Sequence, residues 1–443
     1  MWRRKAQNRT SLRQHLIRGA SGSLLLKACN SGLALLLAVV LARLLGTEGF
    51  GIYALCLSTV EILAMLAMLG GHQLLVREVA SYQSRGMSGH LCGLLKRFAQ
   101  ASALCSLALS MVGALTAFLV FRDSALFGPF LLAMALLPLL TCMQLQGAAL
   151  RGLRHIVLGS LAQNVRPAMV LLLLGGVWFT GSSLQVWSAM AAQVAGSALL
   201  MLATLLFLFW ALPRGVKKAQ PEYETSRWFK SVLPFVFVGV MQILNRELAV
   251  VLLGILQNAE EVGLFRVAQR GALLIPFGLQ AVNMAIAPTV ARMFAEGEKE
   301  RLQRVIHKSI LAILAYALPV ALILILGGKT LLALVFGEAF VPAYAPLVLL
   351  CVGQLINVCT GSVGVVLNMA GMERYTATGV ALAVLVVAIL CLILIPLWGS
   401  VGAAVASSAG LLVWNLLLFV WVYRKTGLVS TLHPRSLFFW GSS

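Results

Sequence analysis

Charge is scarce in this sequence of 443 residues. Only 11% of the residues are charged and only 14 are Asp or Glu, whereas 60% are hydrophobic. A soluble globular protein usually has about 25% charged residues, so this composition excludes that class. No loop is long enough to hold a sizeable soluble domain. Apolar runs of spanning length recur along the whole chain, and they predict a polytopic helical membrane protein.

Motifs for metal, redox or catalytic chemistry are also lacking. The eight cysteines form no C-x-x-C pair and the six histidines have no metal-ligand spacing, so the sequence predicts neither a disulfide framework nor a metal site. It has no glycine-rich phosphate loop, no Asp-rich cluster and no acid dyad in a loop. We therefore predict a protein that is not an enzyme and needs no cofactor. An integral-membrane enzyme is the weaker alternative, because the outer loops are too short to build an active site.

The apolar runs correspond to twelve membrane spans when about 20 residues are allowed for each crossing. Two charge-free stretches, 167–213 and 375–423, are too long for one helix, and we expect breaks at 180–183 and 396–400. The predicted spans are 18–45, 50–72, 98–121, 125–149, 156–179, 184–211, 231–256, 263–289, 309–328, 344–370, 375–396 and 400–423.

Positive charge is distributed very unevenly between the two faces. Of the 34 Lys and Arg residues, 26 fall in the two terminal segments and the loops of one face, and only Arg122 and Lys329 fall in loops of the other. By the positive-inside rule, both termini are expected in the cytoplasm. The net charge of +20 is then an orientation signal that also attracts anionic membrane lipids. It gives no reason to expect nucleic-acid binding.

The chain divides into two similar halves. A predicted cytoplasmic linker loop at 212–230 separates an N-terminal lobe, 1–211, from a C-terminal lobe, 231–443, and each lobe has six predicted spans. Glu48–Tyr53 (EGFGIY) aligns with Glu260–Phe265 (EEVGLF) at an offset of 212 residues. Because six spans separate the two copies, the lobes have the same orientation, and the sequence predicts a parallel repeat. We expect the lobes to rock against each other.

Eight charged residues fall inside the predicted spans. An ionised side chain at mid-membrane costs about 2.5–3.5 kcal/mol on insertion scales, so such residues normally face a protein interior or a hydrated cavity. Cations outnumber acids by six to two, which favours an anionic substrate over an organic cation. The eight residues are Lys27, Arg43, Glu61, Arg166, Arg246, Glu247, Arg266 and Arg270.

Arg266 and Arg270 give the sharpest signal among them. They are four residues apart, so both guanidinium groups lie on one face of the predicted span 263–289. Two like charges held together in a membrane require an anion, and phosphate or diphosphate fits the planar guanidinium fork. For Arg266 a position at the outer interface stays open, because it lies within one turn of the end of the span.

Structural roles stay open for three of the other cations. Lys27 and Arg43 lie near opposite ends of the first span, where their side chains could reach the two interfaces. Arg166 precedes Pro167, and we expect its guanidinium to satisfy carbonyl groups freed at a bend.

The two intramembrane acids are candidates for counter-ions or for coupling. Glu61 lies near the midplane of its span and is predicted to pair with a cation on another span, with proton coupling as the alternative. Arg246 and Glu247 are neighbours in sequence and point about 100° apart on a helix. An ion pair between these two residues is therefore not expected.

Short stretches of the sequence resemble the polysaccharide-transport flippases, a family in the superfamily that also contains the multidrug and toxin extrusion carriers. They are similar to the family patterns R-x-L-G-x-x-x-[FY]-G, F-G-x-x-[FY], L-N-x-x-G and P-x-x-G-x-x-G-A-A. Together they extend over nearly the whole chain. The stretches are Leu41–Tyr53 (LARLLGTEGFGIY), Val335–Phe340 (VFGEAF), Asn368–Gly371 (NMAG) and Ile395–Ala404 (IPLWGSVGAA).

The resemblance implies two six-helix lobes around a central cavity that opens alternately to the two sides of the membrane. It implies a lipid-linked oligosaccharide substrate, an undecaprenyl-diphosphate-linked repeat unit such as that of O-antigen in lipopolysaccharide. It also implies a location in the cytoplasmic (inner) membrane and other polysaccharide-assembly proteins as partners. The diphosphate-binding candidates are then Arg246, Arg270, Arg266 and Lys27, and the coupling or counter-ion candidates are Glu61 and Glu247.

Two other functions stay open at this stage. One is a multidrug-type, cation-coupled antiporter, against which the shortage of intramembrane carboxylates argues. The other is a scaffold of the polysaccharide assembly machinery that transports nothing. The related flippases of peptidoglycan precursors usually have fourteen spans, so the twelve predicted here favour the oligosaccharide branch.

Overall fold

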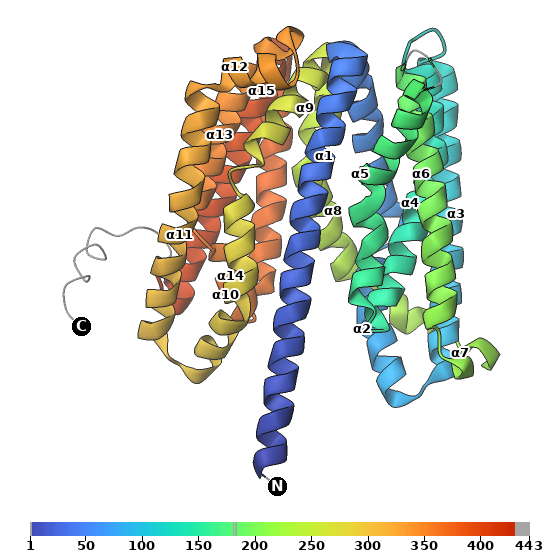
Figure 1. Ribbon diagram of the computed structural model, residues 1–443, viewed down its shortest axis with the longest axis vertical. Coiled ribbons are helices and arrows are strands. Elements are labelled where there is room, and N and C mark those ends of the chain that lie inside the picture. The colour runs from blue at the N-terminus through green and yellow to red at the C-terminus, as the bar shows by residue number, and fades with distance from the viewer. Residues whose placement is uncertain (1, 180, 182–183, 430–443) are drawn as a thin grey trace.

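The computed structural model describes residues 2–179, 181 and 184–429, with side chains described from residue 29 onward. Most of the long helices in this part of the chain run along the long axis of the molecule (Figure 1). The helices are α1 (Trp2–Ala67), α2 (Gly71–Arg85), α3 (Ser88–Val120), α4 (Phe127–Gly152), α5 (Ile156–Phe179), α6 (Val186–Ala211), α7 (Arg214–Lys218), α8 (Thr225–Leu256), α9 (Ala259–Ala272), α10 (Phe277–Glu296), α11 (Lys299–Leu326), α12 (Gly328–Val335), the 3-10 helix η1 (Glu338–Ala343), α13 (Tyr344–Cys359), α14 (Val363–Met369) and α15 (Glu373–Thr426).

The long helices account for twelve membrane crossings. Within the described residues, nine helices are long and apolar enough to span a membrane, and the bent pair α9–α10 makes a tenth. Two of them, α1 and α15, are kinked at Gly46 and Gly399, so each provides two crossings. The predicted all-α polytopic fold with twelve spans is confirmed, and Gly399 lies inside the predicted break at 396–400.

The first predicted loop is replaced by a single sharp bend. Gly46 has a φ of 70° and a ψ of −174°, a backbone conformation that glycine adopts far more readily than other residues. The chain returns to helical geometry directly after it, through Glu48 and Gly49. A single glycine therefore reverses the chain where we expected a loop of several residues.

Two predicted spans are interrupted, and three helices lie in predicted loops. The span 263–289 is broken between α9 and α10, whose axes differ by 47°, because Pro276 has no N–H to continue the first helix. The span 344–370 is broken near Gly361, which has a φ of 71°. Helices α2, α7 and α12 lie where the sequence predicted only loops.

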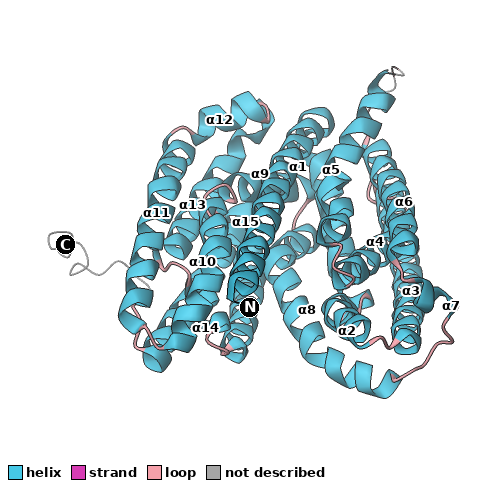
Figure 2. Cartoon of the chain, turned by 60° about the horizontal axis from the view of Figure 1, so that its bottom comes forward, coloured by secondary structure: helices cyan, strands magenta, loops and turns pink. Residues whose placement is uncertain are grey.

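The helices form two groups with α1 between them. In Figure 1, α3 to α6 lie on one side of α1, and α10 to α14 with α15 lie on the other. Figure 2 shows the same separation after the molecule is tilted. This arrangement agrees with two six-helix lobes, and the exact lobe boundaries at 211 and 231 stay a prediction.

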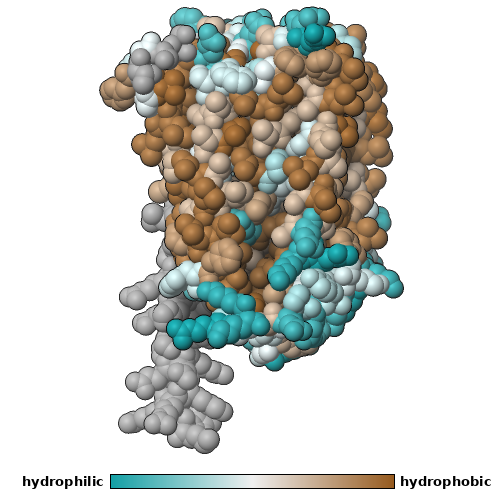
Figure 3. Space-filling model, turned by 90° about the vertical axis from the view of Figure 1, so that its right-hand side faces the viewer, coloured by the Kyte–Doolittle hydropathy of each residue, from teal (hydrophilic) through white to brown (hydrophobic). Residues whose placement is uncertain are grey.

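The molecule has two distinct ends. Helix α7 and the turn between α10 and α11 lie at one end, here called the α7 end, and α12 lies at the other, here called the α12 end (Figure 1). On the side seen in Figure 3, hydrophobic residues cover the middle of the molecule and hydrophilic residues gather towards the two ends. The loops that carry the predicted cationic excess, at 212–224 and around 297, both lie at the α7 end.

The two halves approach each other most closely near the α12 end, where α1 crosses α9. A Cβ atom built on Gly51 would overlap the carbonyl group of Ala259 and would lie 2.9 Å from the backbone nitrogen of Gly263. A Cβ atom built on Gly263 would in turn overlap the carbonyl oxygen of Thr47. Gly51 and Gly263 occupy equivalent positions of the predicted repeat. The repeat therefore brings its own two copies into direct backbone contact.

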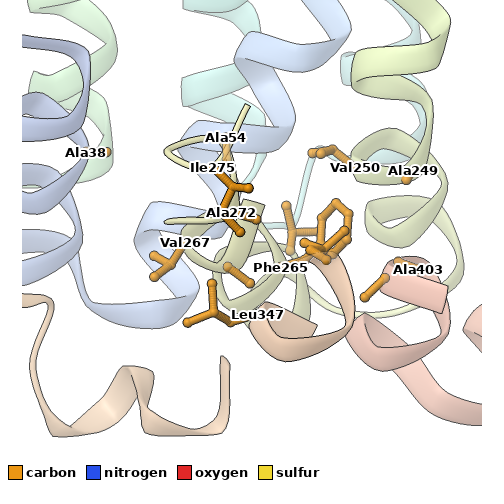
Figure 4. Close-up of a cluster of buried hydrophobic side chains, with 14 of the residues drawn as sticks. Ala38, Ala54, Ala249, Val250, Phe265, Val267, Ala272, Ile275, Leu347 and Ala403 are labelled. Atoms are coloured by element: carbon orange, nitrogen blue, oxygen red, sulfur yellow. The ribbon is translucent and has the colours of Figure 1, made fainter. Parts of the chain in front are cut away.

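Aromatic residues reinforce this closed end. Phe50 lies edge-on to Phe340 of η1, with ring centroids 6.3 Å apart. Phe265 of α9 is fully buried, and Figure 4 shows its ring among buried side chains that include Val250 of α8 and Ala403 of α15. The apolar core is thus continuous across the two halves at the α12 end.

Helix α8 is attached to both halves. Near its start, the buried Trp228 donates a hydrogen bond from Nε1 to the Tyr82 hydroxyl of α2 at 2.9 Å, and burial raises the pKa of Tyr82. At the same end, Glu224 Oε1 lies 3.3 Å from His90 Nε2 of α3. At the other end of α8, Gln257 donates to the carbonyl oxygen of Ile395 in α15 at 3.0 Å. The predicted linker 212–230 is therefore partly helical and packed against the N-terminal half.

Candidate functional site

Six charged side chains from four helices lie together at the interface of the two halves. We call this group the central charge cluster. It draws one residue from α1, one from α5, two from α8 and two from α9, and all of them were singled out from the sequence as intramembrane charges. The members are Glu61, Arg166, Arg246, Glu247, Arg266 and Arg270.

Glu247 is the most enclosed member of the cluster, with 2% of its side chain exposed. Its carboxylate accepts hydrogen bonds from Arg246 Nε at 2.8 Å, from Arg266 Nη1 at 2.9 Å and from Ser58 Oγ at 2.7 Å. A buried ionised carboxylate is tolerated when donors of this kind surround it. The expectation that Arg246 and Glu247 do not pair was wrong, because the long Arg246 side chain folds back along α8 and covers the 100° offset.

Glu61 contacts cations from two other helices. One carboxylate oxygen pairs with Arg166 Nη2 at 3.4 Å, and the other accepts a hydrogen bond from Arg246. Arg166 was expected to satisfy carbonyl groups at the bend near Pro167, and it pairs with Glu61 instead. Arg246 therefore lies between the two carboxylates and links α8 to α1.

Arg266 is enclosed by protein, which argues against the exposed interfacial position left open from the sequence. Only 7% of its side chain is exposed. Besides its ion pair with Glu247, Arg266 donates to the Gln269 side chain at 2.8 Å, and Gln269 donates to the Arg246 carbonyl oxygen at 3.2 Å. These hydrogen bonds hold α9 against α8.

Arg270 differs from the other three arginines of the cluster. Among the described residues, it has no ion-pair partner within 4.0 Å, whereas Arg166, Arg246 and Arg266 each contact a carboxylate. Four arginines and two glutamates leave the cluster with a formal charge of +2. Arg270 accounts for one of these two charges, and the other arises because three arginines share two carboxylates.

Two cavities adjoin the cluster. The larger one has a volume of about 320 Å³ and is lined by polar groups that include Gln144, Gln163 and Gln242 as well as Arg246. It also contacts Met65 and Met68 near the end of the α1 helix, on the side of Glu61 that faces the α7 end. The larger cavity thus approaches the cluster from the cation-rich end of the molecule.

The smaller cavity has a volume of about 80 Å³ and lies on the other side of Glu61. Arg266 and Arg270 line it, together with Tyr53 and Gln193. The Tyr53 hydroxyl donates to Gln193 Oε1 at 3.4 Å. Glu61 and Arg166 line both cavities, so this ion pair marks the boundary between them.

The remaining intramembrane cations lie elsewhere or outside the described part. Arg43 donates to the carbonyl oxygens of Leu334 and Val335 near the α12 end, with a distance of 2.8 Å for Val335. Arg43 is therefore placed to hold α12 against α1 and is not in either cavity. The side chain of Lys27 lies outside the described residues.

Some cavity residues were missed by the sequence analysis. Gln144, Gln163, Tyr53 and Gln193 were not singled out, because isolated polar residues in apolar helices gave no periodic signal. Gln163 lies three residues before Arg166 and therefore on the same helix face. That spacing was the one available signal that this face of α5 borders a hydrated space.

Comparison with protein families gives a match over residues 16–294 to the family described as polysaccharide biosynthesis protein. Among curated proteins, the chain is similar to the probable low-salt glycan biosynthesis flippase Agl15 of Haloferax volcanii, with 26% identity over 237 residues. The match covers 52% of this chain and 49% of that protein. The chain thus matches about half the length of this curated relative.

Solved structures of transporters share the fold. The lipid II flippase MurJ in an inward closed conformation is 13% identical and superposes with a TM-score of 0.72, covering 90% of this chain and 86% of that one. An inward-facing multidrug resistance MATE transporter of the MOP superfamily is 15% identical, with a TM-score of 0.73 and coverage of 89% and 94%. A MOP-superfamily transporter from Pyrococcus furiosus is 16% identical, with a TM-score of 0.60 and coverage of 93% and 96%.

Proposed function

The chain belongs to the polysaccharide biosynthesis protein family, and we propose that it is a flippase for undecaprenyl-diphosphate-linked oligosaccharide repeat units in surface polysaccharide biosynthesis, such as that of O-antigen. The fold is that of MOP-superfamily transporters, as reported above. In this proposal the protein lies in the cytoplasmic (inner) membrane. The lipid-linked oligosaccharide is its substrate, and other polysaccharide-assembly proteins are its partners.

The observation that carries the proposal is the unbalanced charge of the central cluster. An ionised side chain at mid-membrane costs about 2.5–3.5 kcal/mol, yet Arg270 lines a cavity without a carboxylate partner among the described residues. A diphosphate would supply the missing negative charge, and guanidinium groups bind phosphate oxygens through paired hydrogen bonds. We assign diphosphate binding to Arg270 and Arg246, with Arg266 in support and Lys27 as the remaining candidate.

The same contacts suggest how binding acts on the protein. Arg246 lies between Glu61 and Glu247, so a diphosphate that enters the larger cavity competes with Glu61 for this guanidinium. Because Glu61 lines both cavities, its displacement would give the diphosphate access to Arg270 in the smaller one. Release of Glu61 weakens a contact between α1 of the N-terminal half and α8, which begins the C-terminal half. In this proposal, Glu61 and Glu247 are counter-ions whose exchange couples substrate binding to rearrangement, and Glu61 is the candidate for proton coupling.

Alternating access would proceed from a state that is closed at the α12 end. The Gly51–Gly263 crossing and the Phe50–Phe340 contact seal that end, while the larger cavity lies on the α7 side of Glu61. If the cation-rich α7 end is cytoplasmic, as the positive-inside rule predicts, the substrate enters from the leaflet in which it is made. Rocking of 1–211 against 231–443 would then expose the cluster to the opposite side.

The proposal is tested by glycan export from cells that depend on this protein. Cells that lack it should accumulate the lipid-linked oligosaccharide on the cytoplasmic leaflet. The double variant Arg246→Gln/Arg270→Gln should fail to restore export when its amount in the membrane equals that of the wild type. Arg43→Gln is the matched control, because Arg43 is also an intramembrane arginine but lies in neither cavity.

Other outcomes of this experiment would replace the proposal. Normal export by the double glutamine variant would remove both arginines from the site and leave Lys27 as the remaining candidate, and normal export by a variant that also lacks the Lys27 charge would favour a scaffold that transports nothing. If deletion caused no accumulation of lipid-linked glycan but increased sensitivity to organic cations, the protein would be a multidrug-type antiporter.

A further inference from the structure

A third cavity lies away from the central charge cluster, on the outer side of the N-terminal half. It has a volume of about 700 Å³ and is formed by α3, α4 and α6, with α7 at one end. Its walls are mostly apolar and include Leu95 and Leu107 of α3, Leu139 of α4 and Leu205 of α6. We call it the α3–α6 groove.

Helix α4 separates this groove from the substrate cavities. Cys142 and Gln146 of α4 line the groove, whereas Met143 and Gln144 line the larger central cavity. The two sets of residues lie on different faces of the same helix. The groove is therefore a distinct feature of the molecule and not an extension of the central site.

Two lysines give the groove a charged end. Lys96 of α3 and Lys217 of α7 both line it, and both are exposed. They belong to the cation-rich α7 end of the molecule. Apolar surface facing lipid is ordinary in a membrane protein, so the features that distinguish this place are its concave shape and the two cations at its mouth.

The length of the groove matches one leaflet of a bilayer. On α3 its lining runs from Cys92 to Leu107, and the eleven residues of α-helix from Lys96 to Leu107 rise by about 16 Å. The hydrocarbon core of a bilayer is about 30 Å thick, so the part of the groove beyond Lys96 extends over roughly half of it. An acyl chain whose headgroup lies at Lys96 and Lys217 would reach about the middle of the membrane.

We propose that the α3–α6 groove binds one anionic phospholipid from the leaflet at the α7 end. The acyl chain lies between α3 and α6, and the phosphate pairs with Lys96 and Lys217. Separation by α4 and the one-leaflet length favour a resident phospholipid over the lipid tail of a substrate bound at the central cluster. This inference does not depend on the proposed transport function.

The test measures lipids retained by the full-length protein after purification in detergent. Native mass spectrometry should detect phosphatidylglycerol bound in preference to phosphatidylcholine. Each lysine near an anionic headgroup contributes about fivefold in affinity, so the double variant Lys96→Gln/Lys217→Gln should bind phosphatidylglycerol about thirtyfold more weakly. Lys299→Gln/Lys308→Gln is the matched control, because these lysines of α11 lie outside the groove.

A second variant tests the apolar part of the groove. Ala103 lines the groove, so Ala103→Trp should fill it and displace the lipid. Val112→Trp is the control, because Val112 is exposed on the same helix outside the groove, and this variant should retain the lipid.

Equal retention of the two phospholipids by the wild type, or unchanged retention by the lysine variant, would overturn the proposal. Competition by free glycerol phosphate would identify a simple anion site. Preferential retention of a polyprenyl phosphate would identify the substrate lipid as the occupant. Either result would also overturn it.

Discussion

Gly51 of α1 and Gly263 of α9 cross with their backbones so close that neither position has room for a methyl group. The two glycines are equivalent positions of the repeat, 212 residues apart. Their contact closes the α12 end above the smaller cavity. The stability of this closed state therefore depends on the absence of a Cβ atom at two sites.

Gly51→Ala should favour states in which the α12 end is open. An added methyl group that clashes with backbone costs about 1–3 kcal/mol, since the Ala259 carbonyl cannot move as a side chain can. We expect a membrane-impermeant maleimide added from the α12 side to label a cysteine introduced at Ala54 at least tenfold faster in this variant. Gly32→Ala is the control, because a Cβ atom there meets nothing within 4 Å. Equal labelling rates in all three proteins would show that the crossing does not limit access.

Arg270→Met should stabilise the protein and abolish export. The substitution removes a charge without a carboxylate partner among the described residues, so the free energy of unfolding should rise by about 1–3 kcal/mol. Arg246→Met should instead destabilise the protein, because it leaves Glu61 and Glu247 with fewer donors. Thermal unfolding in detergent, measured beside glycan export, separates the two effects. A destabilised Arg270→Met protein would contradict the assignment of a free charge to this residue.

Glu247 and Arg266 should be strongly coupled in stability. Removing one partner of a buried ion pair costs about 3–5 kcal/mol, so Glu247→Gln and Arg266→Gln should each lower the free energy of unfolding by that order. The double variant should lose less than the sum of the single variants, by about 1 kcal/mol or more. A second cycle that combines Glu247→Gln with Arg43→Gln is expected to be additive. Additivity in the first cycle would mean that the pair contributes no stability of its own.

Reporter fusions test the orientation in the membrane. Fusions at residues 220 and 297 lie at the α7 end and should report the cytoplasm, and fusions at residues 259 and 335 lie towards the α12 end and should report the opposite side. The expectation rests on the excess of cations at the α7 end. A fusion at 220 that reports the same side as one at 259 would contradict the twelve-span topology.

The number of spans could be predicted from the sequence because membrane crossings depend on local composition. Runs of apolar residues and the loop charges between them are readable without knowledge of tertiary contacts. The details that failed depend on single residues in context. Gly46 makes a sharp bend where a loop was expected, and Pro276 ends a helix inside a predicted span.

The members of the charge cluster were recognised individually, but their partners were not. Glu61 pairs with Arg246, which is 185 residues away in the sequence, and with Arg166, which is 105 residues away. Such pairings are set by the packing of whole helices, which a single sequence does not encode in any local pattern. Periodicity even gave the wrong answer for Arg246 and Glu247, because helical geometry fixes the direction of Cβ and not the reach of a long side chain.

The attachment of α8 has a mechanical consequence. Trp228 fastens the start of this helix to α2, and Gln257 at its other end holds it against α15. Because both ends of α8 are held, a displacement of one half against the other strains this helix. Either α8 bends, or the hydrogen bond at one of its ends breaks. Pro234 lies inside α8, six residues after Trp228. Because it leaves the helix one backbone hydrogen bond short, it is the point at which flexing costs least.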